Sequence, residues 1–165
     1  MSASSIPSVT DRMLKVSEVC ADDADVLALS VARFVASGYM TSDVACWDAA
    51  FDGAERLLGA AEGGRLVSGM VGVLRALRAE RSGDWQFMPA TCCRVTANEC
   101  ALVALIRRGR CRHWEAVRRE AAELAGRPEA PRLAEAVRDA AETINAAAAR
   151  LQPAEARRPR GTPLH

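Results

Sequence analysis

Apolar residues recur in this sequence at alternating steps of three and four positions. The two clearest runs are Val44, Trp47, Phe51, Ala54, Leu58 and Ala61, and Leu133, Val137, Ala140, Ile144, Ala147 and Leu151. Side chains at this spacing share one face of an α-helix, and such a face is the seam through which helices pack. The spacing therefore predicts amphipathic helices that bury one face.

The amino-acid composition favours the same fold class. Alanine supplies 33 of the 165 residues, whereas Phe, Trp and Tyr together make up 4%, so the aromatic residues that strands favour are scarce. Half of the residues are hydrophobic and 26% are charged, which excludes both a largely disordered chain and an integral membrane protein. The net charge of +1 provides no overall field that would attract nucleic acid or an anionic membrane.

Helix start and stop residues divide the chain into six expected helices. We place them at about 22–38, 42–62, 65–81, 96–110, 112–125 and 131–152. Residues 1–21 are expected to form a loose arm, 84–95 one irregular loop, and 153–165 a disordered tail rich in Pro and Arg. The prediction is a single all-α domain over residues 22–152, in an orthogonal or bundle-like array.

The expected compartment follows from the first residues and from the apolar stretches. The N-terminus lacks the basic segment followed by an apolar one that a signal peptide requires, and the stretch from Leu66 to Leu74 is too short to cross a bilayer. We therefore expect a cytoplasmic protein without a membrane partner. In that compartment the six cysteines are reduced thiols rather than disulfides.

The segment that joins the loop to the fourth helix carries a recognisable helix start. Thr96 and Glu99 form a capping box, in which the Thr hydroxyl accepts from the Glu99 amide and the Glu carboxylate accepts from the Thr96 amide. The surrounding run, residues 89–99, resembles a motif of small Ala/Arg-rich helical alphaproteobacterial proteins of unknown function. In that motif a Cys-containing Pro loop leads into a Thr-x-x-Glu helix start. The resemblance implies a helical fold and a structural role for the motif, and it implies no activity.

Four cysteines and a histidine fall close together in the sequence. They are Cys92, Cys93, Cys100, Cys111 and His113. Such ligands suit zinc, although the spacing contains no Cys-x-x-Cys knuckle, and a thiol near a helix N-terminus is also suited to redox sensing. The alternative is that these cysteines are simply buried. A catalytic cysteine would have only His113 as its base, with no third residue to orient it, so the sequence leans against an enzyme.

Arginines gather around the turn between the fourth and fifth expected helices. Arg107, Arg108, Arg110 and Arg112 form the cluster, and they suggest a site for nucleic acid or another polyanion. Glu115, Glu120 and Glu123 interleave with the arginines that follow, at spacings that favour intrahelical ion pairs on a solvated face.

These observations favour a non-enzymatic interaction or regulatory module over an enzyme. We expect its partner to be another protein or a second copy of the chain, bound through one of two apolar stripes. The first comprises Val44, Trp47, Phe51 and Leu58, and the second Leu133, Val137, Ile144 and Leu151. A single-domain core requires such stripes as well. The alternatives are a thiol- or zinc-dependent sensor at residues 92–113 and a nucleic-acid-binding regulator at Arg107–Arg119; zinc is the only cofactor considered.

Overall fold

The computed structural model describes residues 13–152, and this part of the chain is all-helical. Its helices are α1 (Val16–Val19), α2 (Asp23–Thr41), α3 (Val44–Leu58), α4 (Ala60–Glu80), α5 (Ala97–Arg110), α6 (Trp114–Ala125) and α7 (Pro131–Leu151). The all-α prediction is confirmed, and α2 to α7 correspond to the six expected helices. The short helix α1 is additional. The tail expected at 153–165 lies outside the described residues.

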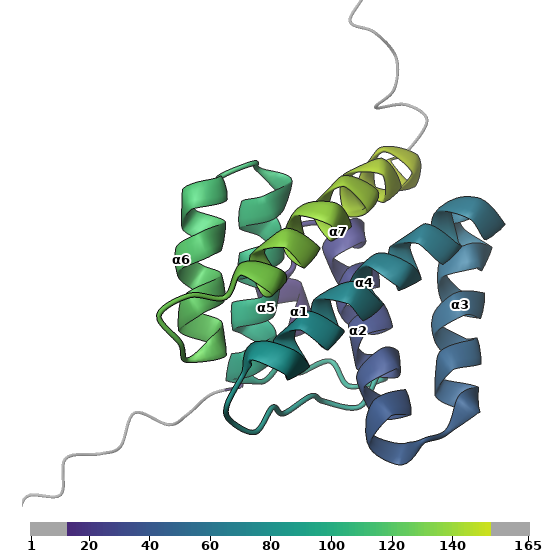
Figure 1. Ribbon diagram of the computed structural model, residues 1–165. Helices are drawn as coiled ribbons and strands as arrows, with labels where there is room; N and C mark the ends of the chain where they lie inside the picture. The colour runs from purple at the N-terminus through teal and green to yellow at the C-terminus, as the bar shows by residue number, and fades with distance from the viewer. Residues whose placement is uncertain (1–12, 153–165) are drawn as a thin grey trace, which may run out of the picture.

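The helices pack as a single helical domain around α4 and α7. Figure 1 shows these two helices side by side at the centre, with α3 at one end and the α5–α6 pair at the other. Gly69 of α4 lies against Ala140 of α7, where an added Cβ would be 3.3 Å from the Ala140 Cα. The small residues therefore let the two central helices approach closely. No helix within residues 13–152 is long and apolar enough to span a membrane.

The boundary between α3 and α4 differs from the one expected from sequence. The break falls at Gly59, whose φ of 86° is in the region that favours glycine, and α4 already begins at Ala60. Gly63 and Gly64, which we expected to end the helix, lie within α4. A Cβ at Gly63 would be 2.5 Å from the backbone nitrogen of Glu55, so this glycine allows α4 to pack on α3.

Of the segment expected as a loose arm, residues 1–12 lie outside the described residues, whereas residues 14–20 are held in place by hydrogen bonds and packing. Val16 donates its amide to the Cys93 carbonyl (2.9 Å), and Val95 donates to the Leu14 carbonyl (2.9 Å). Side chains of α1 and Cys20 pack on a small apolar cluster made of Leu29, Val95 and Val103, separate from the main core. Residues 14–20 therefore hold the loop of residues 84–95 against helices α2 and α5.

Candidate protein-interaction surface

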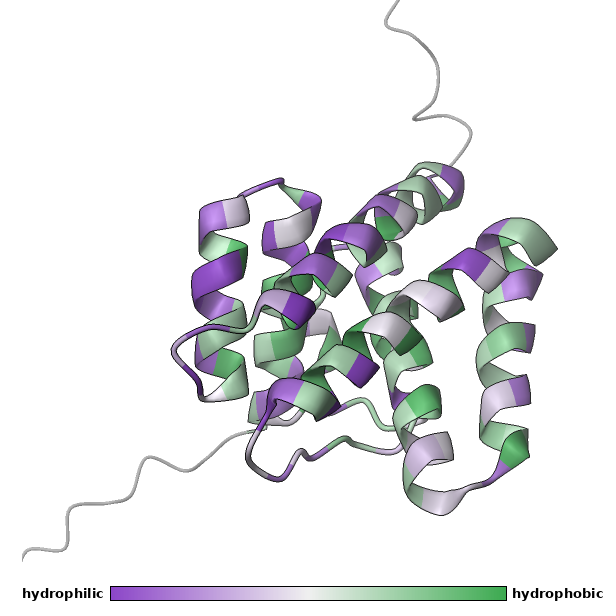
Figure 2. Ribbon diagram, viewed as in Figure 1, coloured by the Kyte–Doolittle hydropathy of each residue, from purple (hydrophilic) through white to green (hydrophobic). Residues whose placement is uncertain are grey.

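Exposed apolar side chains concentrate where α2 turns into α3. Within residues 13–152, eight large hydrophobic side chains are exposed, and four of them fall between positions 39 and 51: Tyr39, Met40, Val44 and Phe51. Met40 is 64% exposed and Val44 68% exposed. Figure 2 shows the hydrophobic start of α3 at the edge of the molecule, beside the α2–α3 connection. We name the surface formed by Tyr39, Met40, Val44, Trp47 and Phe51 the α2–α3 corner.

The end of α2 and the capped start of α3 determine where this corner lies. Helix α2 ends at Thr41, and its C-cap residue Ser42 has a positive φ of 57°. The Asp43 side chain then caps α3 by accepting from the Ala45 amide (2.9 Å). Trp47 then lies on α2 at Gly38, where an added Cβ would be 2.5 Å from the indole nitrogen. The Trp47 ring meets the Tyr39 ring edge-on, with the centroids 5.0 Å apart.

A cavity of about 260 Å³ opens next to the corner, and we name it the loop pocket. Helices α2 and α4 and the loop before α5 form its walls. The apolar and aromatic residues that line it are Ala36, Tyr39, Met40, Leu74, Leu77, Trp85 and Phe87. Tyr39 and Met40 belong to both the pocket and the corner, so the two form one continuous surface.

Arg78, Arg81, Asp84 and Gly83 complete the lining of the pocket. The Arg78 guanidinium lies 5.7 Å from the centre of the Tyr39 ring, and that of Arg81 lies 4.9 Å from the centre of the Trp85 ring. Arg81 also donates to the carbonyls of Leu124 (2.7 Å) and Asp84 (3.2 Å). Its Nε and the Trp85 Nε1 are buried without an acceptor in the described part of the chain. With Asp84 counted, the pocket carries one net positive charge.

A buried ion pair holds the loop that forms the pocket wall. Arg33 of α2 donates Nε to Glu99 (2.7 Å), and the two side chains are 2% and 0% exposed. The same guanidinium donates to the carbonyls of Cys92 (2.6 Å) and Arg94 (2.5 Å). Glu99 also accepts from the amide of Met88 (3.1 Å). The loop is thereby fixed to both α2 and α5.

The structure contains the capping box predicted at Thr96 and Glu99. The Thr96 hydroxyl accepts from the Glu99 amide (3.1 Å), and the Glu99 carboxylate accepts from the Thr96 amide (2.8 Å). The sequence interpretation missed that Glu99 also pairs with Arg33, because the two residues are 66 positions apart. The sequence did contain one sign of this pair. Arg33 lies within the apolar stretch Val31–Ala36, and an arginine at such a position is expected to be buried with a partner.

The structure separates the cysteines and the histidine that the sequence groups. Cys100 lies in the first turn of α5, whereas Cys111 and His113 follow its last turn and are exposed. Eleven residues of helix span about 16 Å, too far for shared ligation of one metal ion. Within residues 13–152, no group of three or more His, Cys, Asp or Glu side chains is placed to hold a metal ion.

The remaining thiols differ in their surroundings. Cys93 is exposed on the loop, whereas Cys92 is half-buried and its sulfur accepts from the Arg94 amide (3.4 Å). Burial, followed by the nearby Asp25 carboxylate, raises the pKa of Cys20 to about 11. Burial and the adjacent Glu99 also raise the pKa of Cys100. These two thiols are therefore shifted away from the reactive thiolate form.

The arginines predicted as a polyanion site have different partners. Arg110 pairs with Asp22 (2.7 Å) and with Asp25, and Arg108 pairs with Glu120 (3.0 Å). Arg107 lies 3.9 Å from Asp25. Arg112 adopts a positive φ of 59° and lines a neighbouring pocket with Trp114 and Arg138. Three of the four arginines thus face carboxylates of the protein itself.

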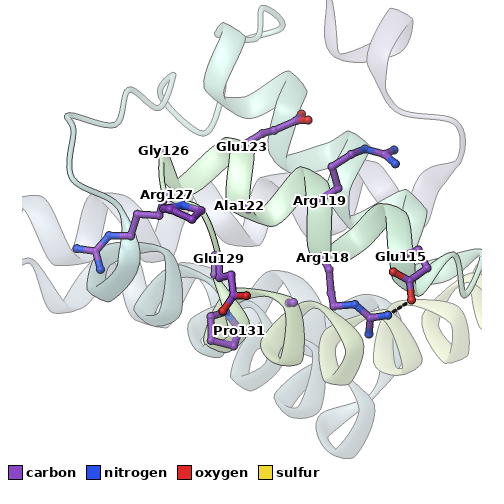
Figure 3. Close-up of a pocket in the computed structure, with 12 residues that line it drawn as sticks. Glu115, Arg118, Arg119, Ala122, Glu123, Gly126, Arg127, Glu129 and Pro131 are labelled. Atoms are coloured by element: carbon purple, nitrogen blue, oxygen red, sulfur yellow. Dashed lines mark hydrogen bonds and ion pairs between the residues drawn. The ribbon is translucent and has the colours of Figure 1, made fainter.

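A groove of about 860 Å³ lies between α6 and the start of α7. Three arginines line it, namely Arg118, Arg119 and Arg127, together with three glutamates, Glu115, Glu123 and Glu129. Figure 3 shows Arg118 bonded to Glu115 at one end, while Arg127 extends away at the other. The charges balance and the arginines do not converge, so the groove has no net charge to select an anion.

The two apolar stripes also differ in exposure. Leu133, Val137 and Ile144 of α7 are each 0% exposed, so that stripe belongs to the core. In the α3 stripe only Leu58 is fully buried, and Val44 and Phe51 remain exposed. The α2–α3 corner with the loop pocket is therefore the candidate interaction surface. No family model, curated protein or solved structure matches this chain, and the resemblance of residues 89–99 to alphaproteobacterial proteins stays a hypothesis.

Proposed function

We propose that this chain is a non-enzymatic interaction module of the cytoplasm that binds another polypeptide through the α2–α3 corner and the loop pocket. The observation that carries the proposal is the continuity of the two features through Tyr39 and Met40. Aromatic side chains and arginine are enriched at protein interfaces, and energetically dominant contacts usually sit in a pocket at the centre of the patch.

The energetics favour an occupied surface. Covering an exposed apolar side chain yields roughly 25 cal/mol for each Å² removed from water, and Met40 and Val44 are both more than half exposed. Trp85, Phe87 and Tyr39 are rigid rings that lose little side-chain entropy when a partner docks. The buried Arg33–Glu99 pair positions the loop that carries two of these rings, so the pocket is formed before any partner arrives.

Native mass spectrometry of the protein isolated from its own host tests the proposal. The wild-type chain is compared with a Met40→Glu, Val44→Glu double variant and with a matched control, Val26→Glu, whose side chain is also exposed (41%) but lies away from the corner. We expect the wild type and the control to retain a protein partner or a second copy, and the double variant to lose it. If all three proteins carry the same assemblies, or none carries any, the proposal is overturned.

A further inference from the structure

We propose that the occupant of this surface is a second copy of the chain, docked across a two-fold axis that passes near Met40. The inference rests on the proposed function and names its partner. Its basis is that the corner carries a cationic pocket on one flank and an acidic, apolar helix on the other. When two copies of such a surface meet across a two-fold axis, the cationic flank of each copy faces the acidic flank of the other.

The pocket accepts side chains rather than a large ligand. Its volume of about 260 Å³ lies below the roughly 300–1,000 Å³ of typical small-molecule sites. Aromatic rings and aliphatic groups line it, and guanidinium groups lie beside two of the rings. The fitting occupant is therefore an apolar side chain with a carboxylate near it.

Helix α3 carries that combination. Its exposed edge places Val44 and Phe51 seven residues apart, with Asp48 between them and Asp52 adjacent. Among residues 13–152, Asp48, Asp52 and Arg78 form no ion pair, and the Arg78 guanidinium lies over the Tyr39 ring. Opposite charges without partners thus remain available on the two flanks.

The two flanks meet at the corner. Arg78 stacks on Tyr39, Tyr39 contacts Trp47, and Trp47 belongs to the same helix as Asp48. Figure 1 shows α3 at the periphery, and its packing partners are chiefly α2 and α4, which leaves its outer edge uncovered. In a two-fold interface each contact occurs twice, so Arg78 of each copy would face Asp48 of its partner around an apolar centre.

Charge reversal with rescue tests the inference on the purified chain of 165 residues. Sedimentation and native mass spectrometry over a dilution series should give a wild-type assembly of twice 17.6 kDa. Arg78→Glu and Asp48→Arg should each raise the dimer dissociation constant by about tenfold or more, because each places two like-charge pairs in the interface. The Arg78→Glu, Asp48→Arg double variant should return it towards the wild-type value.

Matched controls separate a local contact from a change in net charge. Arg119→Glu on α6 and Asp139→Arg on α7 make the same charge changes at exposed sites, and neither residue is part of the corner or of the loop pocket. These variants should leave the dissociation constant unchanged. Circular dichroism checks that every variant remains helical. A monomeric wild type, or a double variant no tighter than the single ones, overturns the inference. A third outcome separates this inference from the proposed function. If the wild-type chain is a monomer that binds a different host protein, and the Met40→Glu, Val44→Glu variant no longer binds it, only the second-copy inference is overturned.

Discussion

At the residue scale, the Glu99 side chain connects α5, α2 and the loop that walls the pocket. It caps α5, neutralises Arg33 and accepts from the Met88 amide of the loop. Glu99→Ala leaves a buried guanidinium without its counter-charge, which costs about 3–5 kcal/mol of unfolding free energy. Thr96→Ala removes the cap and the hydrogen bond that the Thr96 hydroxyl donates to the Gln86 carbonyl (2.8 Å), and it should cost about 1–2 kcal/mol. Urea denaturation measures both values.

Two further variants identify the cause of that loss. Arg33→Met combined with Glu99→Met should be more stable than Glu99→Ala, because no buried charge is left alone. Equal losses for Glu99→Ala and Thr96→Ala would show instead that the buried ion pair contributes no more than the two hydrogen bonds of the Thr96 hydroxyl. The sequence predicted Glu99 as a local cap from a spacing of three, but no local pattern could reveal a partner on another helix.

Thiol reactivity is a second prediction at this scale. Burial raises the pKa of Cys20 to about 11 from an ordinary value of 9.0, so the thiolate fraction at neutral pH falls by about a hundredfold. Cys93 and Cys111 are exposed on the surface. Mass-spectrometric mapping of alkylation should therefore find Cys93 and Cys111 modified long before Cys20. Labelling of Cys20 at the rate of Cys93 would contradict this order; the urea-unfolded chain, in which all thiols react alike, is the control.

At the scale of helices, the α3–α4 hairpin depends on one glycine. A Cβ at Gly63 would be 2.5 Å from backbone atoms of Glu55, which cannot move aside as a flexible side chain can. Gly63→Ala should therefore destabilise the protein by about 1–3 kcal/mol. Gly64→Ala meets nothing within 4 Å and should stabilise α4 by up to about 1 kcal/mol. Thermal unfolding of the two variants should shift in opposite directions; shifts of the same sign would exclude this packing constraint.

Helix ends of opposite polarity meet where α2 begins and α5 finishes. Asp22, the N-cap of α2, pairs with Arg110 near the C-terminus of α5, and Asn145 of α7 accepts from the same arginine (3.0 Å). Chiefly through the Arg110 hydrogen bond, the pKa of Asp22 is held below its ordinary value of 3.8. A lowered pKa in the folded state stabilises the protein above about pH 4, and the effect disappears as the pH falls through the folded value.

Asp22→Asn tests this linkage while retaining an N-cap side chain. At neutral pH the variant should unfold at a lower urea concentration than the wild type, by less than about 1 kcal/mol because the pair is partly exposed. The difference should vanish in acid below the folded pKa of Asp22. Asp23→Asn, at an exposed neighbouring position outside this pair, is the control, and a gap that persists unchanged in acid would contradict the assignment.

Helix existence could be predicted from sequence more readily than helix limits. The three–four spacing correctly indicated a helix at α3 and another at α7, because one buried face dictates that spacing. The α3–α4 limit was misplaced because Gly59 and Gly63 look alike in sequence, yet one supplies a positive φ and the other a close contact. The sequence pattern also placed Val44 and Leu133 on equivalent apolar stripes, although Val44 is exposed and Leu133 is buried. Only the packing of the helices shows that α3 lies at the edge of the domain and α7 at its centre.

At the scale of the whole molecule, the described residues contain two apolar clusters of unequal size. The large one spans α2 to α7, whereas the small one consists of Leu29, Val95 and Val103 with α1 and two cysteines packed against it. The loop that walls the pocket is connected to the small cluster through Val95 and to the large one through Trp85 and Phe87. Its stability therefore depends on fewer apolar contacts than that of the central helices.

Hydrogen exchange should resolve these two levels of stability, because segments with few buried contacts open without global unfolding. Amides of α1 and of residues 84–95 should exchange through a local opening, and those of α4 and α7 only at the rate set by unfolding of the whole domain. In Glu99→Gln, which weakens the tie to Arg33 with little change in shape, exchange should accelerate in residues 84–95 more than in α7. Gly64→Ala, which does not touch the loop, should leave the rate of that segment unchanged. Equal acceleration of the loop and α7 in Glu99→Gln would mean that the domain opens as one unit, and that the pocket wall is as stable as the core beneath it.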